Sequence, residues 1–118
     1  MLHLHRWSPD TLGSGNKIDA MVLHRMSDWL QAGGYSLTMP CQGWEDYELW
    51  FRIARMGGYG LHVPQILARY RVHGSSMLHT LTNTGRNSES LVAYLRRAYP
   101  EFYDPAKVPN VRRHDARL

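Results

Sequence analysis

The strongest pattern of apolar and polar positions lies in residues 45–56, where large apolar side chains recur at helical spacing. They are Tyr47, Leu49, Trp50, Phe51, Ile53 and Ala54. Acidic residues fall in the first turn, where they favour the positive end of the helix dipole, and Gly57-Gly58 ends the pattern. The pattern predicts a central helix at residues 45–57, with Glu48 and Arg52 as a favourable pair four residues apart.

Two weaker helical patterns lie on either side of the central one. Residues 88–99 carry an apolar face and are followed by a proline, which predicts a C-terminal helix. Residues 27–32 begin with Ser-Asp, which can cap a helix, and two glycines that would end a helix follow them. Residues 74–88 are polar and rich in glycine, serine, threonine and asparagine, and we expect a loop there.

Short apolar segments elsewhere have the character of strands. Residues 59–63 and 66–72 lie on either side of Pro64, and we expect two short strands there. Residues 18–24 form another apolar stretch, with Asp19 inside it. Its periodicity alone does not distinguish a buried strand from a helix.

The length and composition place the chain among globular proteins. At 118 residues it has the size of one domain or of part of one. Hydrophobic residues make up 43% and charged residues 20%, which argues against general disorder. No apolar run approaches the roughly 20 residues that span a bilayer, and the first residues do not have the apolar core of a signal peptide. Cys41 is the single cysteine, so an internal disulfide is excluded.

The net charge of +4 is concentrated in the C-terminal part of the chain. Residues 1–68 hold five basic and six acidic side chains, whereas residues 69–118 hold nine basic and four acidic ones. Twelve of the 14 basic residues are arginines, whose guanidinium groups pair well with phosphate and carboxylate. The basic part can therefore face an anionic partner, or it can be an ordinary solvated surface.

The first candidate site is Gly43-Trp44-Glu45-Asp46, which would present an aromatic ring and two carboxylates at the start of the central helix. Adjacent helical residues point about 100° apart, so one carboxylate can act as a general base while the other anchors a substrate. Trp44 can stack on the apolar face of a sugar or another ring. The alternative is a capped helix start with a tryptophan in the core.

The second candidate site is the end of the second expected strand. Arg69, Arg71 and His73 alternate along the sequence and would project from one face of a strand. Two guanidinium groups and an imidazole, followed by Gly74 and two serines, can hold a diphosphate and its metal ion. The alternative is an exposed polar strand face. The other histidines form no metal-binding motif with Cys41.

The order of these two sites resembles that in the C-terminal half of the family 2 glycosyltransferases, over roughly residues 16–77. The resemblance rests on Arg25, Gly33-Gly34-Tyr35, Glu45-Asp46, Leu49, Arg52, Gly57 or Gly58, Val63-Pro64 and Tyr70-Arg71-Val72-His73. It implies an α/β architecture, a partial GT-A fold with short strands, a central helix at 45–57 and a C-terminal helix near 88–99. It also implies that residues 18–23 are a strand of the central sheet.

The resemblance implies roles for individual residues. Asp46 matches the base of inverting enzymes, Glu45 a neighbour that binds acceptor or donor sugar, and Trp44 an aromatic residue that lines the sugar site. His73 matches a residue that completes divalent-metal coordination in some members, and Arg71 would then lie near the diphosphate. The expected cofactor is therefore Mg²⁺ or Mn²⁺.

The sequence departs from the family in having no Asp-x-Asp motif and no donor-binding half. We therefore expect residues 1–80 to be the acceptor-side part of a catalytic domain, and residues 81–118 a C-terminal helix with a basic tail. Such a fragment of an inverting enzyme would transfer sugar from a nucleotide-diphospho-sugar to an acceptor hydroxyl, and alone it would be inactive or nearly so.

The partners and location follow from the same resemblance. The acceptor would be a glycan or a lipid-linked glycan, in the cytoplasm or at the cytoplasmic face of a membrane. A half-sheet leaves an unpaired edge, so we expect pairing with a missing N-terminal half or with a second copy of the chain. The alternative function is a basic module that binds nucleic acid or another polyanion, but this leaves the acidic helix start unexplained.

Overall fold

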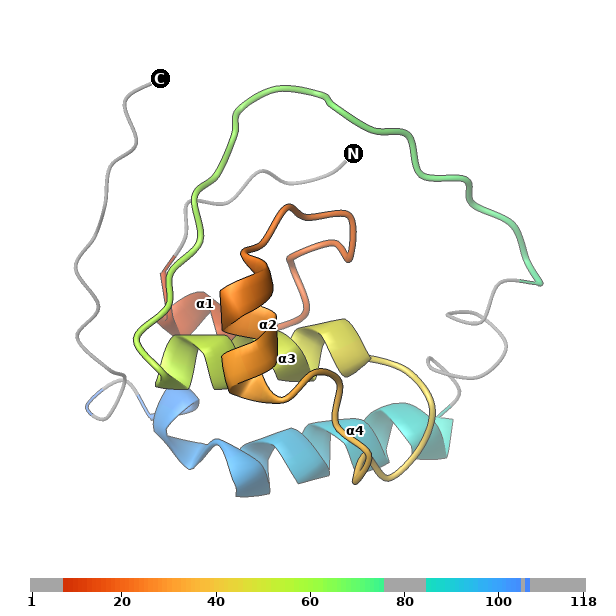
Figure 1. Cartoon of the computed structure of the whole chain (residues 1–118). Coiled ribbons are helices and arrows are strands. Elements are labelled where there is room, and N and C mark those ends of the chain that lie inside the picture. The colour runs from red at the N-terminus through yellow and green to blue at the C-terminus, as the bar shows by residue number, and fades with distance from the viewer. Residues whose placement is uncertain (1–7, 76–84, 105, 107–118) are drawn as a thin grey trace.

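The computed structural model describes residues 8–75, 85–104 and 106, and the regular elements in this part are helical. They are α1 (Asp10–Gly13), α2 (Met26–Ala32), α3 (Glu45–Arg55), α4 (Gly85–Ala98) and the 3₁₀ helix η2 (Pro100–Phe102). Figure 1 shows α3 in the middle of the molecule, with α4 running below it and α2 crossing in front. The helix that carries the first candidate site is therefore the central element.

The core is built around Phe51 of α3, which is fully buried. Its ring centroid lies 4.9 Å from that of Tyr47, 5.1 Å from that of Tyr99 and 5.3 Å from that of Phe102. Leu95 of α4 is buried in the same cluster. Burial of such rings contributes much of the stability of a small core, so this cluster holds α3 against the end of α4 and η2.

The N-terminal helix α1 closes another side of this core, and the sequence pattern did not predict it. Leu12 is 2% exposed, and its carbonyl oxygen accepts a hydrogen bond from the Tyr47 hydroxyl. A Cβ on Gly13 would lie 2.1 Å from the carbonyl oxygen of Phe102, so only glycine permits this close approach. A helix of four residues is too short to show a periodic pattern.

The expected helices are present, with shifted ends. The central helix is confirmed as Glu45–Arg55, and the short helix before the two glycines is α2. The C-terminal helix begins at Gly85, earlier than the expected residue 88. Its first turn is polar and has no fully buried residue, so it has no apolar face by which a sequence pattern could mark it.

The expected α/β architecture, a partial GT-A fold, is wrong for the described residues, which form a small all-helical globule without strands. Residues 59–73 form no helix and pair with no neighbouring strand. The backbone hydrogen bond found within them joins the Gln65 N–H to the carbonyl oxygen of Val63, only two residues earlier. Residues 18–23 are likewise irregular. A strand requires a paired neighbour for its backbone groups, and an apolar pattern along one segment does not supply that neighbour.

Residues 59–75 instead form a long irregular segment that leaves apolar side chains in solvent. Ile66 is 94% exposed, Leu67 72% and Val72 73%. Figure 1 shows this green segment arching away from the helices. Within the ranges that the structure describes, no helix is both long enough and apolar enough to cross a membrane.

Candidate functional site at the start of α3

The start of α3 is shaped by a turn in left-handed backbone conformation. Gly43 has φ 119°, and Trp44, with φ 60° and ψ 24°, is the one non-glycine residue with positive φ among the described residues. This conformation costs a side-chain-bearing residue about 1–2 kcal/mol. Such strain is concentrated at functional sites in proteins, which makes this turn a candidate site.

Directly after the turn, the carboxylates of Glu45 and Asp46 are held by different backbone groups. The Gly43 N–H donates to Glu45 Oε1 over 2.9 Å, and the Tyr47 N–H donates to Asp46 Oδ1 over 2.8 Å. Glu45 therefore folds back over the turn, whereas Asp46 is held against the first turn of the helix. The two carboxylates are therefore held separately, and the predicted division of roles between them stays a prediction.

The environment of Asp46 favours its protonated form. Partial burial is the main cause, and it raises the pKa of this carboxyl above the ordinary value of 3.8. Hydrogen bonds from backbone N–H groups oppose the shift, while the negative charges of Glu45 and Asp19 add to it. A carboxylate with a raised pKa is a stronger base, so Asp46 is better suited to accept a proton than an ordinary surface aspartate.

Asp19 is a site residue to which the sequence reasoning gave no role. Its carboxylate is close enough to raise the pKa of Asp46, and its Oδ1 accepts a hydrogen bond from the Met21 N–H over 2.8 Å. The available signal was an acidic residue inside the apolar stretch at residues 18–24. The loop before α2 therefore contributes negative charge to the start of α3.

Trp44 lies between the core and the surface. Its ring meets that of Tyr47 edge to face, with the centroids 5.6 Å apart, and it is partly buried against the core. Part of the indole is thus structural, and the rest is accessible to a ligand ring. The partial burial agrees with the alternative of a tryptophan in the core, whereas stacking on a sugar stays a prediction.

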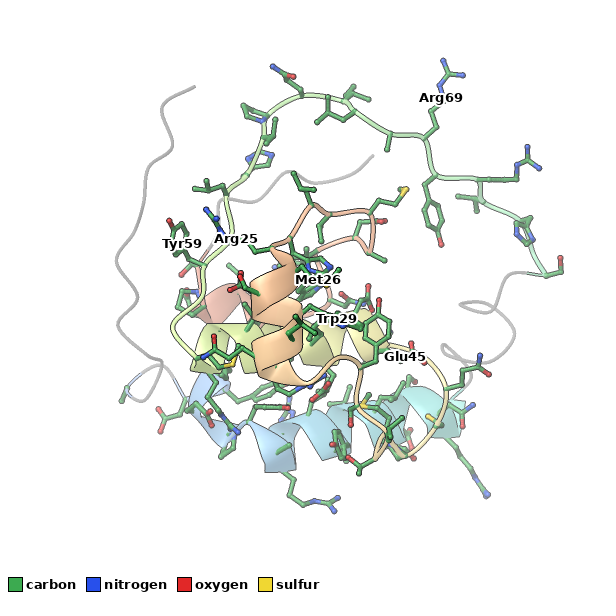
Figure 2. All side chains as sticks on the ribbon, viewed as in Figure 1. Arg25, Met26, Trp29, Glu45, Tyr59 and Arg69 are labelled. Atoms are coloured by element: carbon green, nitrogen blue, oxygen red, sulfur yellow. The ribbon has the colours of Figure 1, made fainter. Side chains whose placement is uncertain are left out.

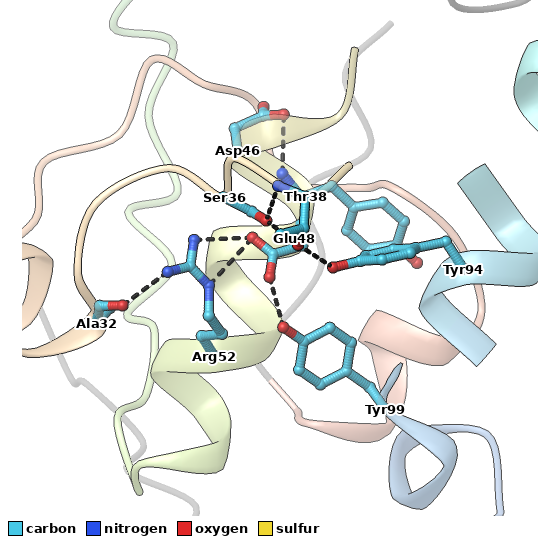
Figure 3. A network of polar contacts seen from close by, with 9 residues as sticks. Ala32, Ser36, Thr38, Asp46, Glu48, Arg52, Tyr94 and Tyr99 are labelled. Carbon is cyan, nitrogen blue, oxygen red and sulfur yellow. Dashed lines mark hydrogen bonds and ion pairs between the residues drawn. The ribbon is translucent and has the colours of Figure 1, made fainter. Parts of the chain in front are cut away.

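A buried polar network fixes α3 relative to its neighbours. Glu48 is 1% exposed, and its carboxylate accepts hydrogen bonds from Tyr99 and, at 2.8 and 3.1 Å, from Arg52. Arg52 also donates to the Ala32 carbonyl oxygen over 2.7 Å, so the network reaches the end of α2 (Figure 3). The expected Glu48–Arg52 pair is confirmed, and it ties together the elements around the candidate site.

The basic residues of the second candidate site lie elsewhere. Arg69, Arg71 and His73 are exposed on the irregular segment, where His73 Nδ1 is hydrogen-bonded to Ser75 Oγ at 3.0 Å. Figure 2 shows Arg69 on the outlying part of this segment, away from Glu45. In the described part of the chain, no hydrogen bond or ion pair joins these residues to the acidic turn.

A metal ion is not accommodated by the side chains that the structure describes. In residues 8–75, 85–104 and 106, no group of three or more histidine, cysteine, aspartate or glutamate side chains could hold one. His73 has Ser75 as its neighbour rather than a second ligand of this kind. We therefore derive no catalytic step through a metal from these residues.

Comparison with known proteins gives no relative for this chain. No protein family, no curated protein and no solved structure matches it. A function for the chain therefore depends on the geometry at the start of α3 and on the sequence motifs themselves.

Proposed function

We propose that this chain supplies the acceptor-activating part of an inverting glycosyltransferase that uses a nucleotide-diphospho-sugar. The observation that carries the proposal is the partly buried Asp46 at the start of α3, directly after the strained Trp44 turn, with its pKa raised by burial and neighbouring charge. The order of motifs that resembles the family 2 glycosyltransferases supports the same function. A helix cap alone would not require a left-handed tryptophan or a partly desolvated aspartate.

In the proposed reaction, the acceptor hydroxyl gives its proton to the carboxylate of Asp46. The hydroxyl oxygen forms a bond to the anomeric carbon, and the bond from that carbon to the diphosphate oxygen breaks. The electron pair leaves with the nucleoside diphosphate, and the configuration at the anomeric carbon inverts. A positioned base contributes about 10²–10⁴ to the rate of such a step, while Glu45 would hold a sugar hydroxyl and Trp44 would pack against a sugar ring.

The proposal requires groups beyond the described residues. Arg71 and His73 are exposed and could meet the diphosphate only if another part of the enzyme brings it to them. The ligands of Mg²⁺ or Mn²⁺ would also have to come largely from that part. We therefore propose that the chain is inactive or nearly so alone and acts with a donor-binding half or with a second copy, on a glycan or lipid-linked acceptor.

The exposed apolar side chains of residues 59–73 support the need for a partner, because an isolated protein rarely leaves so many neighbouring apolar side chains in water. The cytoplasm or the cytoplasmic face of a membrane is the proposed place of action, since nucleotide-sugars are the proposed donors.

The test is Asp46→Asn in the enzyme assembled from this chain and its donor-binding part. The rate of sugar transfer to the acceptor, measured as release of the nucleoside diphosphate, should fall by a factor of about 10²–10⁴. The matched control is Asp10→Asn, the same change at an exposed carboxylate in the first turn of α1, which should leave turnover unchanged. Turnover of Asp46→Asn within a few-fold of wild type would end the proposed role.

The second candidate function is binding of nucleic acid or another polyanion, favoured by the exposure of Arg69 and Arg71 on the irregular segment and of Arg86 and Arg97 on α4. It predicts binding to a short RNA or DNA duplex that weakens steeply as salt rises from about 50 to 200 mM. No binding at low salt would exclude it. This function leaves the acidic turn without a role, so it ranks second.

A further inference from the structure

A row of aromatic side chains leads away from the proposed base. Trp50 lies one helical turn after Asp46, so the two share a face of α3. The ring of His24 lies 6.0 Å from that of Trp50 and stacks at 6.0 Å on Trp29, and the edge of Trp29 meets Tyr35 at 4.8 Å. The row therefore runs from Trp50, in the middle of α3, to Tyr35, which is 49% exposed.

Two polar groups of this row, on Trp50 and His24, have no hydrogen-bond partner among the described residues. Trp50 is only 9% exposed, and its Nε1–H is buried. This N–H has no hydrogen-bond acceptor in the described part of the chain. A buried donor without a partner costs free energy unless a ligand or water supplies one. His24 beside it is exposed, and none of the hydrogen bonds found among the described residues involves its ring. A ligand hydroxyl next to the exposed His24 could hydrogen-bond to its ring.

The surroundings of the row indicate the chemical class of the ligand. Next to Tyr35, the Ser36 and Thr38 hydroxyls lie 3.0 Å apart, and Thr38 reaches Tyr94 at 3.1 Å (Figure 3). An exposed aromatic ring at Tyr35, followed in the same loop by hydroxyl groups, suits a ligand ring with C–H faces and hydroxyl edges. At the other end, the negative charges near Asp46 repel phosphates and acidic sugars.

We propose that the row of His24, Trp29, Tyr35 and Trp50 is a binding site for a neutral pyranose ring, the ring of the acceptor. Its role as acceptor site rests on the proposed glycosyl transfer, whereas sugar binding itself does not. Figure 2 shows Trp29 on the same side of the molecule as Glu45. A ring that packs along the row extends toward the carboxylates at the start of α3, where its hydroxyl would meet the base.

The test is direct binding of simple sugars to the full chain, with no donor present. Methyl glycosides of glucose, galactose, mannose and N-acetylglucosamine are titrated to about 100 mM, and binding is followed by saturation-transfer NMR and tryptophan fluorescence. We expect saturable binding of at least one of them. Glucose 6-phosphate should bind more weakly than methyl glucoside.

Tyr35→Leu and Tyr70→Leu form a matched pair, because the two tyrosines are 49% and 51% exposed and only the first lies in the row. Tyr35→Leu should weaken sugar binding about 2- to 12-fold, and Tyr70→Leu should leave it unchanged. Equal binding by the two variants, or no saturable binding of any of the four glycosides, would overturn the proposal.

The same titration on Asp46→Asn separates the two proposals. The variant should keep saturable sugar binding, because the four rings of the row are unchanged and only the partner of one sugar hydroxyl is altered. If sugar binding depends on Tyr35 but Asp46→Asn keeps its turnover in the assembled enzyme, the transfer mechanism fails and the sugar site remains. If Asp46→Asn loses turnover but no glycoside binds, the sugar site fails and the base remains.

Discussion

The hydroxyl of Tyr99 donates a hydrogen bond to the buried carboxylate of Glu48, across a sequence separation of 51 residues. Burial and the hydrogen bond to Glu48 raise the pKa of the Tyr99 hydroxyl, so it is a donor at every physiological pH. With Arg52 on the other oxygen, the carboxylate is satisfied from both sides. This contact joins the residue after α4 to the middle of α3, and it holds the helix that carries Asp46.

The first prediction is that Tyr99→Phe lowers the free energy of unfolding by about 1–3 kcal/mol, because the Glu48 carboxylate loses one donor and cannot regain it from water. Urea unfolding followed by circular dichroism measures this. Tyr94→Phe is the control, since the Tyr94 hydroxyl contacts Thr38 in an exposed position, and its effect should stay within about 0.5 kcal/mol. Equal losses in the two variants would contradict the role assigned to Glu48.

The second prediction concerns the backbone at Trp44. Alanine at this position keeps the left-handed strain, whereas glycine removes it, so Trp44→Gly should be more stable than Trp44→Ala by about 1 kcal/mol. This is the reverse of the usual order in ordinary secondary structure. Thermal unfolding of both variants under the same conditions gives the comparison, and an alanine variant of equal or higher stability would refute the left-handed turn.

The third prediction is a pH dependence of stability that originates at Asp46. Its pKa is raised in the folded state, so the folded chain binds this proton more tightly than the unfolded chain does. The stability of the wild type relative to Asp46→Asn is therefore highest below the ordinary carboxyl pKa of 3.8 and falls as pH rises through the raised pKa.

Unfolding of both proteins in urea from about pH 3 to pH 7 measures this difference. Asp10→Asn, measured alongside, controls for the loss of one negative charge. The free energy of unfolding of the wild type relative to Asp46→Asn should fall as pH rises. A value that does not change with pH, or that increases with pH, would show that the carboxyl is not desolvated.

The sequence predicted α3 well because everything that specifies it is local. The apolar face at helical spacing, the acidic first turn and Gly57 just beyond the helix all lie within one segment. The strands at 59–63 and 66–72 failed because a strand is defined by its partner, and a partner is set by contacts between distant segments. The acidic residues at the start of the helix are adjacent in the sequence and could be predicted. The proximity of Asp19 to Asp46 is a contact between distant segments, and the sequence does not indicate it.

The aromatic row shows the same limit. Trp29 and Trp50 belong to different helices, and His24 meets both from the loop before α2. No spacing in the sequence indicates that these rings meet. The domain division at residues 80 and 81 and the basic tail stay predictions, since residues 107–118 lie outside the described part of the chain.

The fourth prediction concerns the apolar side chains of the irregular segment. Ile66 and Leu67 are 94% and 72% exposed, so Ile66→Ser with Leu67→Ser should leave the free energy of unfolding within about 0.5 kcal/mol of wild type. If these residues contact a partner, the double variant should weaken association of the chain with itself or with a donor-binding half. Sedimentation velocity measures association, and unchanged association would remove this segment from the interface.

The most direct measurement of the central claim is the pH profile of kcat/KM for glycosyl transfer by the assembled enzyme, compared between wild type, Asp46→Asn and Asp10→Asn. With Asp46 as the base, wild-type kcat/KM rises with pH through a pKa above 3.8, and Asp46→Asn loses that limb together with about 10²–10⁴ of the rate. Asp10→Asn should follow the wild type. An Asp46→Asn enzyme that keeps both the wild-type rate and the acidic limb would contradict the account.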